Sequence, residues 1–324
     1  MGDPLEILVQ GYSLTLRIAE AEQIEVKVVD TCQDKEASSP DIAYNLSVHE
    51  DNSHPGFGEE GKYHSADHAH PLPKGEVLTF ALVGQQNSGK TTLATTLATA
   101  IYDTFNATVI VLYPDLEAPV LPVIFPNEKS EDLGSVGVPL SKTDIENEVI
   151  IQNLVTIKER QNFGFLGYKE SENKYTYPKY GRAKAEALLE KLCELADYVV
   201  VDCPSNVENN PLASTALELS WQTLRLATPD LKCISWYISQ APLFTDSKIR
   251  WDEQIQGINS PNADVYMPLE EAKSHLKDVS FTVPFSRAIK EQAQRGCLHL
   301  PCGDKRYTAR MREIAEKVVT YGQD

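Results

Sequence analysis

One short segment of the sequence has the residue types and spacing of a phosphate-binding loop. Residues 84–91 read Gly-Gln-Gln-Asn-Ser-Gly-Lys-Thr, which fits the pattern G-x-x-x-x-G-K-[ST]. Gly84 and Gly89 allow backbone angles that are closed to other residues, so successive N–H groups can face phosphate oxygens. Lys90 would neutralise β- and γ-phosphate charge, and the Thr91 hydroxyl would bind Mg²⁺. The segment therefore predicts a site for a nucleoside triphosphate such as ATP, with Mg²⁺.

The flanking sequence predicts the elements that must position this loop. Residues 77–83 form an apolar run that is typical of a buried strand. Residues 91–102 are rich in Ala, Thr and Leu and predict a helix whose N-terminus faces the phosphates. The predicted nucleotide-binding residues of this segment are Gly84, Gln86, Asn87, Ser88, Gly89, Lys90, Thr91 and Thr92.

Two further apolar strands run into carboxylates. One is followed by Asp115 and Glu117, and the other by Asp202. Ligands of a parallel sheet bind outside the carboxyl ends of its strands, where such carboxylates can hold Mg²⁺ or orient an attacking water. A plain strand-end turn is the alternative for either aspartate. The candidate catalytic residues are Lys90, Asp202 and Asp115, and the candidate metal ligands are Thr91 and Asp202.

From residue 76 onward strands alternate with helices. This is the pattern of a doubly wound, mainly parallel α/β sheet, here of the P-loop NTPase type. The predicted strands are 77–83, 107–113, 161–166, 198–202, 222–227, 253–258 and 279–284. The predicted helices are 91–102, 144–150, 181–196, 211–219, 230–240, 268–276, 286–295 and 306–320.

A smaller module is expected ahead of this sheet. Predicted strands at 5–9 and 24–29 flank an amphipathic helix at 13–21, which together resemble a βαβ fragment. We divide the chain into a receiver-like or truncated βαβ module at 1–48, a linker at 49–74 and a P-loop NTPase domain at 75–324.

Two sets of metal-binding residue types have a simpler interpretation. Five of the seven histidines, at positions 49, 54, 64, 68 and 70, fall in a polar segment whose irregular spacing favours a solvated linker over a metal site. Cys297, His299 and Cys302 are expected to form a packed turn because a fourth ligand is missing from the sequence pattern. The apolar stripe of helix 306–320 is narrow, so we expect it to pack on the sheet rather than on a membrane.

Charge and composition limit the partners. The net charge is −17, and residues 1–75 carry five Lys/Arg against fourteen Asp/Glu. Such an acidic chain repels phosphate backbones, so nucleic acid is not expected and protein partners are favoured. The N-terminus lacks the basic region of a secretory signal, and the six cysteines lack a framework spacing. These features predict a cytoplasmic protein whose membrane contact is at most peripheral.

Several motifs, in the same order, resemble the MinD/ParA-like division of P-loop ATPases. The segments that carry the resemblance are Asp202-Cys203-Pro204-Ser205, Asp115-Leu116-Glu117, Thr228-Pro229-Asp230 and Val283-Pro284-Phe285-Ser286. The resemblance implies that Asn259 contacts adenine and that Pro284 belongs to the nucleotide site. It also implies a homodimer that positions or assembles a larger cellular machine.

The chain departs from that family at one charged position. Gln85 stands where hydrolysing members carry a signature lysine that reaches the partner's nucleotide. Because such a cation stabilises the charge that develops in phosphoryl transfer, we expect weak ATP hydrolysis. Arg160, Arg182 or Arg287 could supply a substitute cation. A non-hydrolysing ATP-binding scaffold and a DNA-partition ATPase are the alternatives.

The N-terminal module suggests a subgroup. A small βαβ-like unit ahead of the ATPase is similar to the arrangement in TadZ/CpaE proteins. That resemblance implies a pilus or secretion apparatus, or another assembly at the cell pole, as the partner, and recruitment to the membrane or a pole through it.

Overall fold

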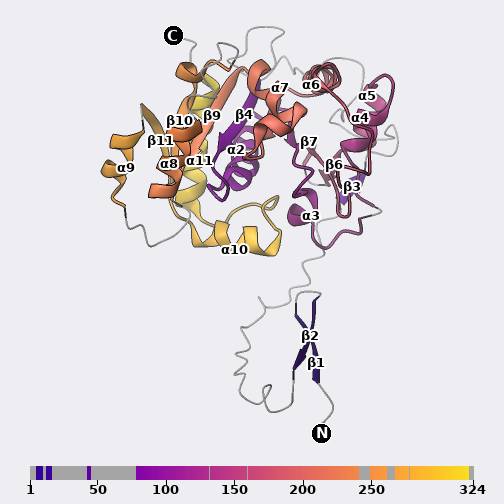
Figure 1. The fold of residues 1–324 in the computed structure, drawn as a ribbon, viewed down its shortest axis with the longest axis horizontal. Helices are drawn as coiled ribbons and strands as arrows, with labels where there is room; N and C mark the ends of the chain where they lie inside the picture. The colour runs from indigo at the N-terminus through magenta and orange to yellow at the C-terminus, as the bar shows by residue number, and fades with distance from the viewer. Residues whose placement is uncertain are drawn as a thin grey trace. The chain divides into compact units, whose positions relative to one another are not determined.

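The protein is described from a computed structural model (Figure 1). The structure describes residues 5–9, 12–16, 42–44, 78–130, 132–158, 160–240, 249–260, 267–276 and 278–320. The chain divides into two compact units, Met1–Ser38 and Ser39–Asp324. The larger unit contains the predicted phosphate-binding loop.

Among the described residues, a mainly parallel sheet of nine strands forms the centre of the larger unit. Its strands are β3 (Ile42–Tyr44), β4 (Leu78–Gly84), β5 (Val109–Tyr113), β6 (Val155–Ile157), β7 (Arg160–Gly167), β8 (Tyr198–Asp202), β9 (Gln222–Ala227), β10 (Ile255–Asn259) and β11 (Val279–Val283). They lie in the order β11-β10-β9-β4-β8-β5-β7-β6-β3. All pairings from β11 to β7 are parallel, whereas β6 and β3 pair antiparallel at one edge. The predicted doubly wound α/β fold is confirmed.

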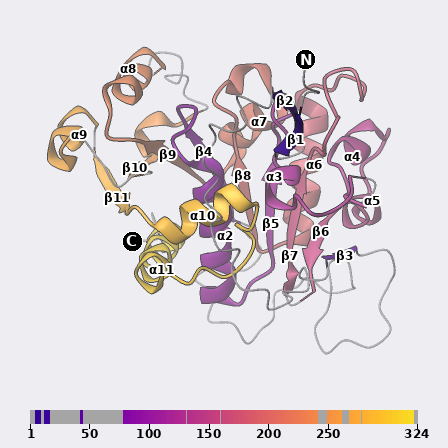
Figure 2. The same cartoon turned by 90° about the horizontal axis from the view of Figure 1, so that it is seen from below.

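Helices cover both faces of this sheet. They are α2 (Lys90–Phe105), α3 (Leu121–Ile124), α4 (Gly137–Ser141), α5 (Asn147–Ile151), α6 (Arg182–Leu195), α7 (Pro211–Leu219), α8 (Leu231–Gln240), α9 (Leu269–His275), α10 (Arg287–Arg295) and α11 (Lys305–Thr320), with 3₁₀ turns η1 (Val207–Asn209) and η3 (Trp251–Glu253). On one face α2 packs on β4, β5 and β8, and α11 lies beside it (Figure 2). On the other face α6 and α7 pack on β8, and α7 also contacts β4.

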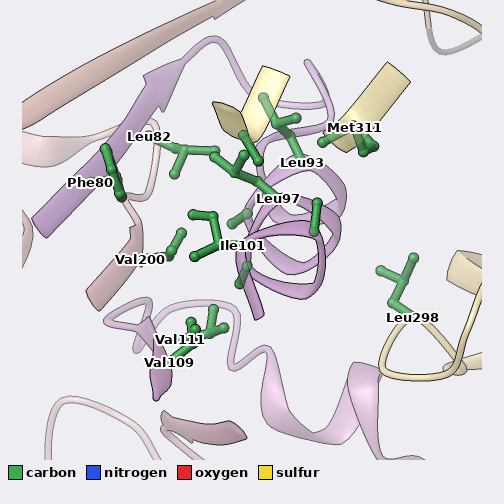
Figure 3. Packing of buried hydrophobic residues seen from close by; sticks show 14 of the residues in the cluster. Phe80, Leu82, Leu93, Leu97, Ile101, Val109, Val111, Val200, Leu298 and Met311 are labelled. Carbon is green, nitrogen blue, oxygen red and sulfur yellow. The ribbon is translucent and has the colours of Figure 1, made fainter. Parts of the chain in front are cut away.

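The apolar run of β4 explains why it is central. Phe80 and Leu82 belong to the core cluster under α2, whereas Ala81 and Val83 belong to the cluster under α6 and α7. A strand that is buried on both faces is apolar at nearly every position, whereas a strand with one exposed face alternates apolar and polar residues. Figure 3 shows side chains of α2, among them Leu97, pointing toward the residues of these strands.

Helix α11 packs within the protein, as expected. Tyr307, Met311, Ile314 and Val318 lie on its buried face, and the helix contacts α2 and β11. Each such side chain stabilises the fold by roughly 1.5–3 kcal/mol through burial. Among the described helices, none combines the length and apolarity that crossing a membrane requires.

The predicted elements differ from the observed ones mainly in short segments. The three-residue strand β6 and the one-turn helices α3 and α4 have too few residues to produce a period in the sequence. The remaining helices and parallel strands of the larger unit lie within about three residues of their predicted bounds.

The smaller unit corrects one prediction. Strands β1 (Leu5–Val9) and β2 (Tyr12–Leu16) pair antiparallel, with Val9 opposite Tyr12. The helix predicted at 13–21 is therefore wrong over its first residues, because apolar and polar residues alternate with period two and a two-residue connection favours a hairpin. The predicted strand at 24–29 and the predicted linker at 49–74 lie outside the described residues.

Strand β3 comes from a part of the chain that was expected to belong to the N-terminal module. Ile42–Tyr44 pairs with β6, so this segment is the edge of the main sheet. Along the chain, the first compact unit ends at Ser38 and the second begins at Ser39, whereas the predicted module ended at residue 48.

Candidate nucleotide-binding site

The predicted phosphate-binding loop connects β4 to α2 and needs both of its motif glycines. A Cβ at Gly84 would lie 2.3 Å from the carbonyl oxygen of Leu226 on the neighbouring strand. Gly89 has a φ of 87°, in the left-handed region that favours glycine. Asn87 also has a positive φ of 64°, which asparagine tolerates better than most residues. Gln86 and Asn87 are exposed, so the outer side of the loop is open to a ligand.

Lys90 is buried at the base of the loop, and its ammonium group is fully hydrogen-bonded. It donates to the carbonyl oxygens of Gly84 at 3.0 Å and Gln85 at 2.9 Å, and to Ser205 Oγ at 2.9 Å. Burial lowers the pKa of Lys90, and the negative charge of Asp202 opposes that shift. The three hydrogen bonds hold the ammonium group of Lys90 close to the start of α2, where the motif requires it.

Thr91 and Asp202 form the second polar contact of the site. The Thr91 hydroxyl donates to Asp202 Oδ2 at 2.5 Å, which joins the first turn of α2 to the end of β8. Asp202 Oδ1 is buried and has no hydrogen-bond partner. Burial raises the pKa of Asp202 to about 6, while the hydrogen bond from Thr91 opposes the shift. A carboxylate oxygen without a partner, beside a hydroxyl, fits Mg²⁺, which prefers oxygen ligands.

Asp115 lies near these residues without contacting them directly. Its Oδ1 accepts hydrogen bonds from the backbone N–H groups of Glu117 and Ala118, each at 2.9 Å, so it forms a strand-end turn. Its charge nevertheless raises the pKa of both Lys90 and Asp202, as a minor contribution in each case. Asp115 therefore forms a strand-end turn and also lies near the candidate metal ligand Asp202.

Asn259 meets the loop from the end of β10. Its side-chain amide donates to the carbonyl oxygen of Ser88 at 2.8 Å, and a Cβ at position 89 would lie 2.3 Å from the same amide nitrogen. Asn259 therefore supports the loop backbone, a role that the sequence did not suggest. Pro284 follows β11 at the same edge of the sheet, and Thr92 is half-buried on the first turn of α2.

Ser205 is the site residue that the assignment from sequence missed. It was part of a recognised motif but received no role, although its hydroxyl contacts Lys90 directly. The available signal was a hydroxyl three residues beyond Asp202, at the end of the strand next to β4.

The three arginines that could replace the signature lysine each form an ion pair with a carboxylate. Arg160 pairs with Asp103, Arg287 pairs with Glu291, and Arg182 pairs with Glu186 and Glu218.

The segment that holds Cys297, His299 and Cys302 forms a packed turn, as expected. The His299 ring is buried against Phe125, with 4.7 Å between ring centroids. Within the described part of the chain, no group of three or more His, Cys, Asp or Glu side chains is placed to hold a metal ion. The five histidines at 49–70 lie outside the described residues.

Comparison by sequence matches the chain to no protein-family model and to no curated protein. Solved structures do match it. A ParA family ATPase from Chlorobium tepidum superposes with a TM-score of 0.62 at 12% identity, over 74% of this chain and 98% of that one. The septum site-determining protein MinD of Pyrococcus horikoshii, complexed with Mg-ADP, has a TM-score of 0.58 at 16% identity, over 75% and 96%. The MinC:MinD cell division protein complex of Aquifex aeolicus has a TM-score of 0.59 at 15% identity, over 76% of this chain and 97% of that one.

The chain has the MinD/ParA fold. The matched share, 74% of the chain, is smaller than the larger unit, Ser39–Asp324. At these identities the similarity concerns the fold alone, so the roles of individual residues depend on the geometry of this site.

Proposed function

We propose that this protein binds ATP·Mg²⁺ and uses its nucleotide state to position or assemble a larger protein machine. The observation that carries the proposal is the joint placement of Lys90, Thr91 and Asp202 around one glycine loop at the carboxyl edge of the sheet. This edge is where ligands bind in doubly wound folds.

Each residue has a defined part in this proposal. Lys90 and the loop N–H groups would bind the β- and γ-phosphates, and Thr91 with Asp202 would hold Mg²⁺. Mg²⁺ would neutralise phosphate charge there. Asp115 would orient a water at the γ-phosphate. Asn259 and Pro284 lie at the ends of β10 and β11, so they would border the nucleoside.

Hydrolysis is expected to be weak. Gln85 cannot supply the missing positive charge, and the three candidate arginines are each paired with a carboxylate. We therefore propose a turnover far below the median of about 10 s⁻¹ for enzymes, unless a partner adds a cation.

The partner is proposed to be a protein. A MinD relative of the same fold is solved in complex with MinC, and the net charge of −17 disfavours nucleic acid. We propose a pilus or secretion apparatus, or another assembly at the cell pole, as the machine that is positioned. A homodimer, and a cytoplasmic protein that its partner recruits to the membrane or pole, complete this proposal.

The test of nucleotide binding is Lys90→Ala. Titration with a fluorescent ATP analogue and Mg²⁺ should show at least about a hundredfold weaker binding, because a charge-assisted contact to phosphate is lost. Lys191→Ala is the matched control, since Lys191 is a surface lysine paired with Glu194. Circular dichroism establishes that the variant is folded. Undiminished binding by folded Lys90→Ala protein would refute the site.

A non-hydrolysing scaffold is the second candidate, favoured by Gln85. Phosphate release from the purified protein separates the two. Slow release that is abolished by Asp202→Asn supports a weak ATPase, whereas bound nucleotide without any release supports the scaffold.

A further inference from the structure

A cleft lies beside the candidate nucleotide site. It has a volume of about 880 Å³ and is lined by Asp115 and Glu117 after β5, by residues of the loop after β7, and by residues between β8 and α7. Lys90 and Thr91 are not among its lining residues. The volume is at the upper end of the range of roughly 300–1,000 Å³ for ligand pockets.

The wall after β7 is held in place by a buried carboxylate. Glu172 accepts hydrogen bonds from Ser135 Oγ at 2.7 Å, from the backbone N–H of Lys169 at 2.9 Å and from the Tyr177 hydroxyl at 2.5 Å. Gly137 lies directly beneath the Tyr177 ring, because a Cβ there would be 2.1 Å from it. The wall therefore has a defined shape without a ligand.

Three of the exposed side chains of the lining could contact a ligand. The Tyr175 ring is 84% exposed, and its contact is with the Lys174 ammonium group, 5.1 Å from the ring centroid. On the opposite wall the side chains of Asn206 and Asn209 are exposed. Tyrosine is enriched at protein interfaces, and a side-chain amide both donates and accepts, as a peptide backbone requires.

Charge indicates what the cleft accepts. The Glu117 carboxylate is exposed at the end next to the nucleotide site, beside Asp115, which has one oxygen outside its turn. These carboxylates attract a cationic side chain and repel the phosphates of a nucleic acid. Lys174 and Lys179 also line the cleft, on the loop after β7. The negative charge that can attract a cation is therefore that of Asp115 and Glu117.

We propose that this cleft binds an extended, Lys- or Arg-containing segment of a partner protein. A basic side chain of the segment lies at Asp115 and Glu117, its backbone meets the Asn206 and Asn209 amides, and its apolar parts pack on the Tyr175 ring. Binding does not require nucleotide, and the cleft shares only Asp115 with the residues assigned to the proposed ATP site.

The test uses a fluorescein-labelled peptide of about six Lys-Pro repeats, which is extended in solution, at an ionic strength of about 0.15 M. Fluorescence anisotropy is measured on the nucleotide-free full chain. Tyr175→Ala and Glu117→Lys should each weaken binding by about fivefold or more, as expected for contacts at the centre of an interface. Leu231→Ala, at another exposed apolar residue, and Glu316→Lys, at an exposed carboxylate on α11, are the matched controls and should change it by less than about twofold.

The outcomes are decisive. Failure to bind, equal binding of a Glu-Pro peptide, or an equal loss in Glu316→Lys would overturn the proposal, the last because it would indicate diffuse attraction to an acidic protein. Binding of single-stranded DNA that depends on Tyr175 would assign the cleft to nucleic acid instead. Lys90→Ala should bind the peptide normally, which separates this test from that of the ATP site.

Discussion

At the scale of single residues, the candidate nucleotide site holds hydrogen bonds to Lys90 that a bound nucleotide would have to rearrange. The three acceptors around Lys90 satisfy its three ammonium protons without any phosphate. Two of the acceptors are carbonyl oxygens of the loop itself, whereas the third, Ser205, comes from beyond β8. Phosphate binding has to replace at least one of them, and the side-chain hydroxyl is the acceptor most easily exchanged.

Ser205→Ala should therefore tighten ATP binding. A hydrogen bond to a charged group contributes roughly 1.5–3 kcal/mol, part of which water restores, so we expect about a threefold to tenfold gain in affinity. The measurement is equilibrium titration with ATP and Mg²⁺. Ser214→Ala is the control, because the Ser214 hydroxyl donates to the Pro211 carbonyl oxygen within α7. An unchanged or weaker affinity would show that Ser205 does not compete with phosphate.

At the scale of elements, short connections fasten the helices on one face of the sheet. The turn between α10 and α11 carries His299, which packs on Phe125 at the end of α3. Phe125 in turn meets Phe165 of β7 edge-on at 5.2 Å. A polar residue thus sits in an aromatic environment, and burial lowers the pKa of His299 to about 4.

His299 should make stability depend on pH. Its pKa is lower in the folded state than the ordinary value near 6.5, so the unfolded state binds more protons as the pH falls from about 6.5 toward 4. Between pH 7 and pH 5 the native protein should lose about 2 kcal/mol more unfolding free energy than His299→Phe, in which nothing titrates. Urea denaturation at both pH values measures the difference. Parallel losses in the two proteins would contradict the assignment.

At the scale of the whole molecule, the first residues divide between two structures. The hairpin of β1 and β2 belongs to a compact unit that ends at Ser38, whereas β3 completes the edge of the main sheet. A β-strand edge without its partner exposes backbone N–H and C=O groups. The two parts should therefore respond differently to truncation.

A chain that starts at Ser39 should bind ATP within about twofold of the full chain, because it keeps every strand of the sheet. A chain that starts at Lys74 lacks β3, and its midpoint of thermal unfolding should fall by at least about 2 °C, with more aggregation. Calorimetry and light scattering on both proteins test this. Equal behaviour of the two truncated chains would show that β3 contributes nothing to the sheet.

The sequence by itself determined the features that depend on local pattern. The loop at 84–91, the carboxylates after two strands and the alternation of strands with helices are written in consecutive residues, so the α/β fold and the candidate ligands could be predicted. Period and composition were sufficient because parallel strands buried on both faces are apolar throughout. The hairpin of β1 and β2 was missed because its five-residue strands also allow a helical interpretation.

Only the tertiary structure decided what lies beside what. Ser205 contacts Lys90 across a sequence separation of 115 positions, and Asn259 contacts Ser88 across 171 positions. No local sequence period extends over such separations. The pairing of β3 with β6 and the cleft between three strand ends likewise arise from strand order. Strand order is set by the packing of the whole sheet, and for that reason the neighbours of the candidate nucleotide site could not be predicted from the residues alone.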